Sequence, residues 1–416
     1  MLATKSVTQS FHDDSLDGLL SDYLTLTYNA IHYGQENDIS NRKGMKGFYR
    51  SLSGIELPSF YKTAAISRAC AVLESRKKSK KRNIETRHPK PLKPMICIIS
   101  GFFVTMKGRL FIPLTKRNKY ADVVLNHHVQ ERIKGKKLRS LTITPGSLLL
   151  CYSEEVKEIP VRTVYGVDRN EKNLTFGNTE RVVQIDMAET VRIRQTTRQI
   201  VRSFKRNDVR IRKKLASRYW KRCTNRTNQT LHAATNLIVK KAVEDGAALA
   251  LEDLTNIRNL YRKGNGQGTN YRFRLNSWPY SRAYHMLEYK SVWKGVTMIP
   301  LTKSETYGSS SECALCGEKL HTSEKGDAEH KRMLWCQTCK VWTDRDVNAA
   351  LNLSKRGLSR FDSSLSLRSL AGENKGEAIE AVKGNPTTPV ILRVDASKSG
   401  GWRHPMLDGI KQHPST

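Results

Sequence analysis

The chain has 416 residues, of which 38% are hydrophobic, and its 72 Lys and Arg against 39 Asp and Glu leave a formal net charge of +33. This length suits two or three domains, and a charge so far above what solubility requires favours a polyanionic partner, because neutralising phosphates releases counterions. The longest apolar stretch, Ile96 to Val104, is too short to cross a bilayer. Charge alone leaves open a nucleic-acid-binding protein, a ribosomal-type protein and a protein that binds an anionic membrane surface.

The first 85 residues are predicted to be helical. Apolar residues recur at helical spacing from Leu16 to Ile31, behind a cap at Asp13 or Asp14. A second helix begins near Pro58 and runs into a basic cluster that ends at Arg82. A proline-broken linker follows.

Residues 95–160 change character. Short β-rich runs alternate with Gly, Pro and polar breaks, which predicts a small antiparallel barrel or sheet. The predicted strands are Met95 to Ile99, Phe102 to Met106, Leu110 to Leu114, Leu138 to Ile143, and Leu148 to Tyr152.

From residue 161 the pattern becomes three strands, a helix, a strand, a helix and a last strand. That order is typical of an RNase H-like α/β fold. The predicted elements are Val161 to Val167, Leu174 to Phe176, Val182 to Ile185, a basic helical stretch over about 190–245, Ala247 to Leu251, a helix from Pro279 to about Trp293, and Val296 to Ile299. Residues 262–276 are expected to form a glycine-rich basic loop, and residues 361–416, rich in Ser, Gly, Lys and Pro, a mobile tail.

Four of the eight cysteines form two CxxC pairs, Cys313 with Cys316 and Cys336 with Cys339. Two residues between thiolates let one turn present both sulfurs to a single ion, so two such turns predict a structural four-cysteine zinc site. Gly317 suits the tight turn of the first pair. His321 and His330 lie between the two pairs and are alternative zinc ligands. Because four thiols already complete a zinc site, we expect both histidines to lie at the surface.

The segment from Met1 to Asp14 lacks the basic start and apolar core of a secretory signal. We therefore expect a cytoplasmic chain, in which thiols stay reduced and bind metal or lie buried.

Three acids stand out by their positions. Asp168 and Glu252 each end an apolar strand, and Asp346 begins a helical run. Such residues can converge at one edge of a sheet and hold two Mg²⁺ ions for an in-line displacement at phosphorus. Asp253 and Asp344 are rivals of their neighbours, because an Asp after a strand often caps a turn and one at a helix start is an ordinary cap.

A strongly basic helix and two interleaved aromatic residues, Tyr219 and Trp220, are predicted to contact nucleic acid, against the alternative of a solvated helix face. The basic residues are Arg198, Arg202, Lys205, Arg206, Arg210, Arg212, Lys213, Lys214, Arg218, Lys221 and Arg222. The loop from Tyr261 to Arg274 is either a mobile lid or a plain flexible loop.

Four motifs resemble, in their order, those of TnpB, the RNA-guided endonuclease family of IS200/IS605-type transposons, long called a transposase. They are Gly166-Val-Asp-Arg-Asn, Leu249-Ala-Leu-Glu-Asp-Leu, Ser309 to Gly317, and Cys336 to Cys339 followed by Asp344-Arg-Asp-Val-Asn-Ala-Ala. Miniature type V CRISPR effectors share this order. The match runs over about 160–355, and Lys340 stands where a glycine is often found.

The resemblance implies that Asp168, Glu252 and Asp346 are the catalytic carboxylates of a RuvC domain and that they bind Mg²⁺. It also implies a flexible N-terminus (1–12), a helical recognition lobe (13–85), a β-barrel-like wedge domain (86–160), a RuvC-like nuclease domain (161–310) interrupted by a zinc-binding insertion (311–340) and completed by its last motif (341–360), and a disordered basic tail (361–416).

The resemblance further implies an RNA-guided DNA endonuclease linked to transposition and DNA recombination. The implied partners are guide RNA and target DNA, and no membrane is expected to take part. The implied active form is a monomer bound to RNA, associated with the nucleoid. The alternatives are a non-cleaving RNA-guided DNA-binding repressor, a miniature type V CRISPR effector, and a junction resolvase or strand-transferase on the same fold.

Overall fold

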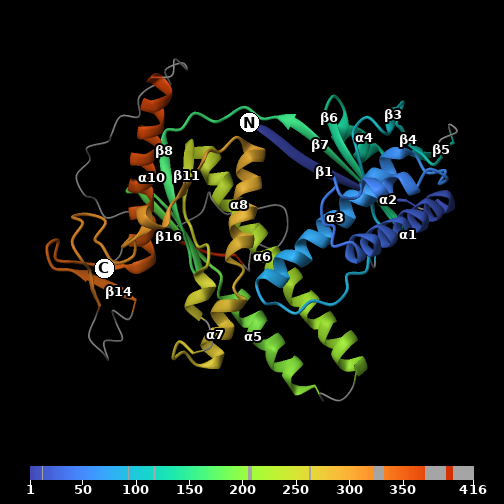
Figure 1. The fold of residues 1–416 in the computed structure, drawn as a ribbon. Coiled ribbons are helices and arrows are strands. Elements are labelled where there is room, and N and C mark those ends of the chain that lie inside the picture. Colours follow the sequence, from blue (N-terminus) through green and yellow to red (C-terminus); the bar gives the residue numbers. More distant parts are fainter. Residues whose placement is uncertain are drawn as a thin grey trace. The chain divides into compact units, whose positions relative to one another are not determined.

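The computed structural model describes residues 1–11, 13–91, 93–115, 119–204, 209–261, 264–322, 332–370 and 390–396. The chain divides into two compact units, Leu2–Glu155 and the remainder from Val156, which are described separately (Figure 1). Over the described ranges, no helix combines the length and apolar character needed to span a membrane.

The first unit contains the predicted helices and most of the predicted strands. The Asp13 carboxylate caps the first helix by accepting a hydrogen bond from the Ser15 backbone N–H at 2.9 Å. The helices are α1 (Asp14–Glu36), α2 (Lys46–Ser51), α3 (Ser59–Lys81) and α4 (His127–Ile133). The strands are β1 (Leu2–Ser10), β2 (Ile96–Ile99), β3 (Val104–Met106), β4 (Arg109–Pro113), β5 (Tyr120–Val124), β6 (Lys137–Thr144) and β7 (Ser147–Glu155).

The strands form two antiparallel sheets, one in the order β1-β7-β6-β2 and one in the order β3-β4-β5. The prediction of a flexible N-terminus over 1–12 is wrong for residues 2–10, which pair along their whole length with β7. Only Ala3 and Val7 of this strand are buried apolar residues. Its hydrophobic pattern was therefore too weak to indicate a strand, and pairing with a distant segment decides its structure.

Helices and strands of this unit share one hydrophobic core. Residues of α1 and α3, such as Tyr23 and Tyr61, belong to the same buried cluster as Leu141 and Leu150 of the larger sheet. The expected division between a helical lobe at 13–85 and a β-rich domain at 86–160 is consequently not a division between separate compact units. The helices bury their apolar faces against the sheet rather than against each other alone.

The second unit contains a six-stranded sheet in the order β12-β11-β8-β9-β10-β16. The predicted succession of three strands, helix, strand, helix and strand is confirmed. The strands are β8 (Thr163–Arg169), β9 (Asn173–Gly177), β10 (Arg181–Asp186), β11 (Ala247–Glu252), β12 (Met298–Leu301) and β16 (Val390–Asp395). The helices are α5 (Ala188–Ser203), a π-helical turn η1 (Ile211–Leu215), α6 (Ala216–Asp245), a 3₁₀ turn η2 (Ile257–Tyr261), α7 (Thr269–Ser277), α8 (Tyr280–Lys294), α9 (Lys303–Thr306) and α10 (Arg345–Leu370).

The predicted disordered tail over 361–416 is wrong in two places. Helix α10 continues to Leu370, and Val390–Asp395 forms β16, parallel to β10. Leu392 and Val394 pack against the core of this unit. This strand, Val-Ile-Leu-Arg-Val-Asp, contains four apolar residues, a signal too short to stand out from the Ser-, Gly- and Pro-rich composition around it. Residues 371–389 and 397–416 lie outside the described residues.

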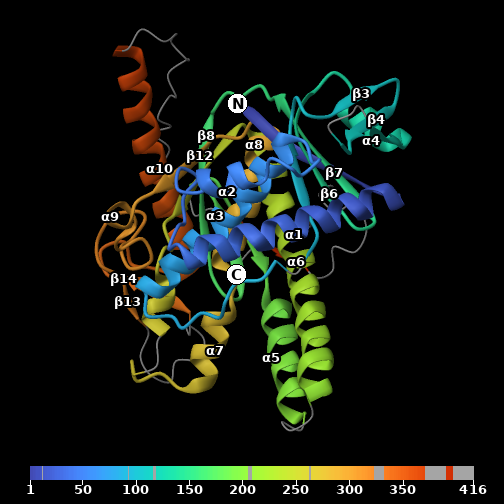
Figure 2. The same cartoon turned by 45° about the vertical axis from the view of Figure 1, so that its right-hand side comes forward.

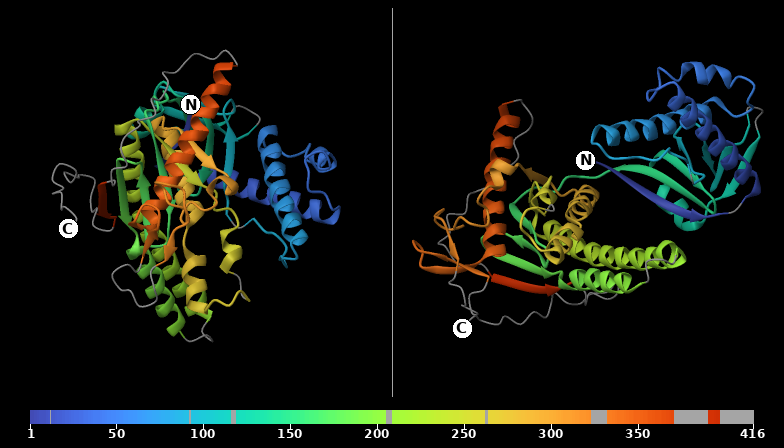
Figure 3. Two further views of the ribbon diagram at one scale, coloured as in Figure 1. Left: turned by 90° about the vertical axis from the view of Figure 1, so that its left-hand side faces the viewer. Right: turned by 60° about the horizontal axis from the view of Figure 1, so that its bottom comes forward.

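Helix α10 covers one face of this sheet, and α6 and α8 cover the other (Figures 1 and 3). Close approach of α10 to β8 depends on Gly166. A Cβ atom at this position would lie 2.0 Å from the Ala350 carbonyl oxygen and 2.4 Å from the Ser354 nitrogen. The absent side chain therefore lets helix and strand backbones pack together.

Helices α5 and α6 lie side by side and project beyond the sheet as a two-helix arm (Figure 2). The carboxyl-terminal half of α6 belongs to the core, through residues such as Leu231 and Ile238. The glycine-rich segment is shorter than predicted, because residues 269–277 form α7. The guanidinium of Arg198 on α5 lies 4.1 Å from the ring centroid of Phe273 on α7, which ties this helix to the arm.

Replacing Gly166 with alanine should destabilise the second unit, since the new methyl group meets backbone atoms that cannot rotate away. We expect a loss of about 1–3 kcal/mol of unfolding free energy, measured by chemical denaturation. Gly18→Ala is the control, because a Cβ there meets no atom within 4 Å and the residue lies inside α1. Equal stability of the two variants would show that α10 does not pack this closely on β8.

Candidate functional site

Two acids lie at the carboxyl ends of neighbouring parallel strands. β8 and β11 pair with Gly166 opposite Ala250, so Asp168 and Glu252 follow two residues later at the same edge of the sheet. Gly166 and Ala250 both pack against α10. Because side chains two residues apart in a strand point to the same face, Asp168 and Glu252 lie on the α10 face.

Asp346 lies in the first turn of α10, at the same edge. Its neighbour Asp344 caps the helix, accepting hydrogen bonds from the backbone N–H groups of Asp346 at 2.9 Å and Val347 at 3.2 Å. Asp344 also accepts a hydrogen bond from the Gln184 amide at 3.2 Å. The capping role considered for Asp346 thus falls to Asp344, and the Asp346 side chain is available for other contacts.

Two asparagines hold the Asp346 carboxylate. The Nδ2 atom of Asn170 donates to Asp168 Oδ2 at 2.5 Å and to Asp346 Oδ1 at 2.7 Å, so one amide bridges the two acids. The Nδ2 atom of Asn173 donates to Asp346 Oδ2 at 2.7 Å. Sequence reasoning assigned no role to either asparagine, although Asn170 lies only two residues after Asp168. Their importance depends on contacts with a residue more than 170 positions away.

Two arginines balance the negative charge. Arg332, which directly precedes β14 (Met333–Cys336), donates from Nη2 to Asp346 Oδ2 at 2.5 Å, and its side chain is half exposed. Arg169 is 3% exposed and donates from Nη2 to the Glu252 carbonyl oxygen at 2.5 Å. One cation therefore contacts Asp346 from the segment between the two cysteine pairs, and the other holds the backbone carbonyl at the end of β11.

Asp168 and Asp346 are buried, Glu252 is half-buried, and the acids repel one another. Burial raises the pKa of Asp168 well above its usual value, and the negative charges of Glu252 and Asp346 raise it further. Burial also raises the pKa of Glu252, an effect that the nearby Arg169 partly opposes. Binding a cation would relieve this repulsion and favour the ionised carboxylates.

The donor set suits a hard divalent cation such as Mg²⁺, which prefers carboxylate oxygens. The three acids do not gather as closely as the cysteines. Within the described part of the chain, only the four cysteines form a metal-binding type of cluster in which all ligand atoms lie within 4.8 Å of one another. Asn170 and Arg332 contact the same carboxylate oxygens that a metal ion would use.

The four predicted cysteines do come together. The Sγ atoms of Cys313 and Cys339 are 4.0 Å apart, and those of Cys316 and Cys336 are 3.5 Å apart. Sulfurs bound to one tetrahedral zinc are separated by about 3.8 Å, given a Zn–S distance of about 2.3 Å. The four side chains therefore fit a zinc ion and leave no open coordination position.

Backbone geometry supports the two turns of this cluster. Gly317 has φ +84°, in the left-handed region that its position after the first pair predicted, and Lys340 has φ +54°. A glycine is relaxed at such an angle, whereas Lys340 adopts it with a side chain present. The strands β13 (His321–Thr322), β14 (Met333–Cys336) and β15 (Val341–Asp344) form a small sheet around the cluster. His321 is exposed and outside the cluster, and His330 lies outside the described residues.

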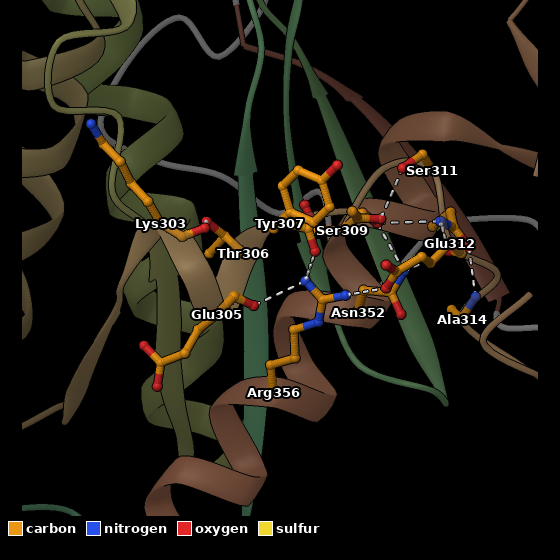
Figure 4. Close-up of polar contacts among 12 residues, drawn as sticks. Lys303, Glu305, Thr306, Tyr307, Ser309, Ser311, Glu312, Ala314, Asn352 and Arg356 are labelled. Carbon is orange, nitrogen blue, oxygen red and sulfur yellow. Dashed lines mark hydrogen bonds and ion pairs between the residues drawn. The ribbon is translucent and has the colours of Figure 1, made fainter. Parts of the chain in front are cut away.

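Helix α10 also anchors the loop that carries Cys313 (Figure 4). The Nδ2 atom of Asn352 donates to the carbonyl oxygens of Ser309 and Glu312, both at 2.8 Å. Arg356 donates to the carbonyl oxygens of Glu305 and Tyr307 and to the Glu312 carboxylate at 2.6 Å. The helix that presents Asp346 thus also holds the first cysteine turn.

The predicted nucleic-acid residues differ in their surroundings. Arg198 is half-buried against α7, and Trp220 packs near Phe273, so both contribute to packing of the arm. The residues Arg202, Arg210, Lys214, Arg218, Lys221 and Arg222 are exposed. Lys205 and Arg206 lie outside the described residues, as do the side chains of Arg212 and Lys213.

Three comparisons bear on the family. The family model described as the Cas12f1-like TNB domain matches residues 280–353, which include the four cysteines and Asp346. A TnpB-like protein of Methanocaldococcus jannaschii is 28% identical over 236 residues, covering 53% of this chain and 78% of that protein. The chain is thus similar to a TnpB-like protein over about half of its length.

Two further similarities accompany the similarity to TnpB. A Streptomyces pristinaespiralis protein named "Putative RNA-guided DNA endonuclease" is 27% identical over 217 residues, 51% of this chain and 49% of that protein. The fold is similar to the Cas12f1 chain in a complex with sgRNA and target DNA, with a TM-score of 0.53 and 13% identity over 81% of each chain. The TnpB resemblance of the sequence is confirmed.

The zinc assignment predicts about one zinc per chain in purified protein, measured by elemental analysis. Cys336→Ser should remove most of the bound zinc and lower the melting temperature, because a structural zinc site contributes directly to folding. Cys97→Ser, at an exposed cysteine outside the cluster, should change neither quantity. Full zinc occupancy in Cys336→Ser would contradict four-cysteine coordination.

Proposed function

We propose that this chain is an RNA-guided DNA endonuclease that hydrolyses phosphodiester bonds with Asp168, Glu252 and Asp346, leaving 5′-phosphate and 3′-hydroxyl ends. The observation that carries the proposal is the convergence of these acids, far apart in the sequence, at one buried edge of the sheet. The similarity to Cas12f1 and the name of the Streptomyces relative support RNA and DNA as the partners.

Each of the three carboxylates is held in position by the surrounding structure, as a catalytic role requires. Asp168 and Glu252 are positioned by strands in the sheet interior, and Asp346 by a helix that another acid caps. Asn170 and Asn173 orient the Asp346 carboxylate. The rival Asp253 is exposed, and its carboxylate accepts a hydrogen bond from the Thr255 N–H in a turn. This division of roles favours Glu252 over Asp253 and Asp346 over Asp344.

When bound at these acids, Mg²⁺ would supply activation of the attacking water and stabilisation of the leaving oxygen. The chain itself holds the carboxylates in a water-poor edge of the sheet, where electrostatic interactions are strong. Arg332 carries positive charge to the exposed side of Asp346, where a phosphate group would arrive. Arg169 keeps the end of β11 in place.

The two-helix arm supplies a basic surface for guide RNA or the guide–target duplex. Arg218, Lys221 and Arg222 are exposed on α6 and have no carboxylate within 4.0 Å among the described residues. Unpaired cations of this kind attract phosphates, whereas base pairing with the guide reads the sequence.

Asp168→Asn, Glu252→Gln and Asp346→Asn should each lower DNA cleavage by about 10³-fold or more, equivalent to about 4 kcal/mol of lost transition-state stabilisation. The measurement is cutting of a matched plasmid in Mg²⁺ by the chain with its co-purified RNA. Asp362→Asn, at an exposed acid on the same helix as Asp346, is the matched control and should cut within a few-fold of the natural chain. Unchanged cutting by Asp168→Asn would refute the site, and RNA-guided binding by the natural chain without cutting in Mg²⁺ or Mn²⁺ would favour a repressor.

A triple variant in which Arg218, Lys221 and Arg222 are each replaced by glutamine should bind RNA more weakly. The slope of log affinity against log salt should fall by about 2, because each lost phosphate contact removes about 0.7–0.9 from the slope. The slope is measured by titration at several salt concentrations. Lys240→Gln with Lys241→Gln is the control, because these lysines pair with Glu244 on the same helix. An unchanged slope would exclude α6 from the binding surface.

A further inference from the structure

A pocket of about 520 Å³ opens beside the candidate catalytic edge. Three parts of the chain form its walls. They are the carboxyl ends of β11 and β12, the segment that directly follows β11, and the first turns of α8. Its lining includes Arg169, Glu252, Asn256, Arg258, Tyr280 and Tyr284. Pockets of this size hold small ligands, and one proposed catalytic acid, Glu252, forms part of the wall.

The pocket contains a buried cation with an unused donor. Arg169 is 3% exposed, and its two Nη atoms donate to the carbonyl oxygens of Glu252 and Tyr280, the latter at 3.4 Å. Its Nε has no hydrogen-bond partner among the described residues. A buried guanidinium N–H without an acceptor is costly, so Arg169 keeps an unmatched donor and its positive charge in the wall of the pocket.

The same pocket presents an aromatic surface. The Arg169 guanidinium lies 5.3 Å from the ring centroid of Tyr284, which is half-buried on α8. Tyr280, one turn earlier, is 7% exposed and forms the deeper wall. At the rim, Arg258 and His285 are exposed, and Asp253 is engaged with the Thr255 N–H at 2.8 Å. An aromatic ring, a buried cation and polar rim groups match the parts of a nucleotide: base, phosphate and sugar.

We propose that this pocket, called the Tyr284 pocket, receives one unstacked nucleotide of the DNA strand that is cut, with its base against Tyr284. The proposal rests on the proposed endonuclease function. Glu252 lines the pocket and belongs to the candidate catalytic edge, so a nucleotide bound here is a near neighbour of the scissile phosphate. A base inside a duplex cannot enter such a pocket, and the strand must therefore be locally single-stranded.

The probe is a target DNA series with one 2-aminopurine at each successive position of one strand or the other. The complete RNA-bound protein binds these targets in Ca²⁺, and stacking on a tyrosine quenches the fluorescence. We expect quenching at a single position in the natural chain and in Tyr284→Phe, which keeps the ring, and loss of quenching in Tyr284→Leu. The Leu variant should also cut with a kcat/KM about tenfold or more lower in Mg²⁺, as expected for a lost base–aromatic stack.

Tyr289→Leu is the matched control, because Tyr289 lies on the same helix outside the pocket and packs against Trp293. It should keep both the quenching and the cleavage rate, and equal melting temperatures of the variants would exclude a folding defect. Quenching and cleavage that both survive Tyr284→Leu would overturn the proposal while leaving the endonuclease function intact. Quenching only when 2-aminopurine is in the RNA would assign the pocket to the guide. Tyr284-dependent quenching in DNA by a chain that does not cut would support the pocket and contradict the endonuclease.

Discussion

The repulsion among Asp168, Glu252 and Asp346 is the constraint around which this part of the molecule is organised. The pKa of Asp168 is raised by burial and by the two neighbouring negative charges, so the ionised form is disfavoured in the fold. A raised pKa of this kind costs stability as pH rises and the group ionises, until a cation offsets it. The charge of Arg169 and the hydrogen bond from Asn170 lower the pKa of Asp168 and offset part of that cost, and a divalent ion would offset more. Arg332 and Asn173 contact the neighbouring Asp346 instead.

Helix α10 connects this charged edge to the rest of the unit. It packs against β8 at Gly166, where no side chain intervenes, and presents Asp346 from its first turn. Farther along, Asn352 and Arg356 hold the loop that leads to Cys313. The four-cysteine cluster, the sheet and Asp346 therefore share one rigid element. A change in the cysteine cluster is expected to reach Asp346 through this helix.

The positive charge of the chain is distributed between two kinds of position. The arm of α5 and α6 exposes arginines and lysines to solvent, where they can contact phosphates without a large desolvation cost. Arg169 is instead buried next to acids and tyrosines, and burial lowers its pKa while Glu252 and Asp168 raise it. The first arrangement suits nonspecific attraction of a polyanion, whereas the second suits placement of a single nucleotide.

Local patterns in the sequence were sufficient for the α/β order, the four cysteines and the three candidate acids, because strand periodicity, CxxC spacing and strand-end position are short-range signals. They could not show that β1 and β16 join sheets, since both depend on pairing with segments more than 130 residues away. The preference for Asp346 over Asp344 came from the resemblance to TnpB and not from these local signals. Neither the local signals nor the resemblance revealed Asn170, Asn173, Arg332 and the Tyr284 pocket. Those features exist only where distant segments meet, so tertiary structure alone decided them.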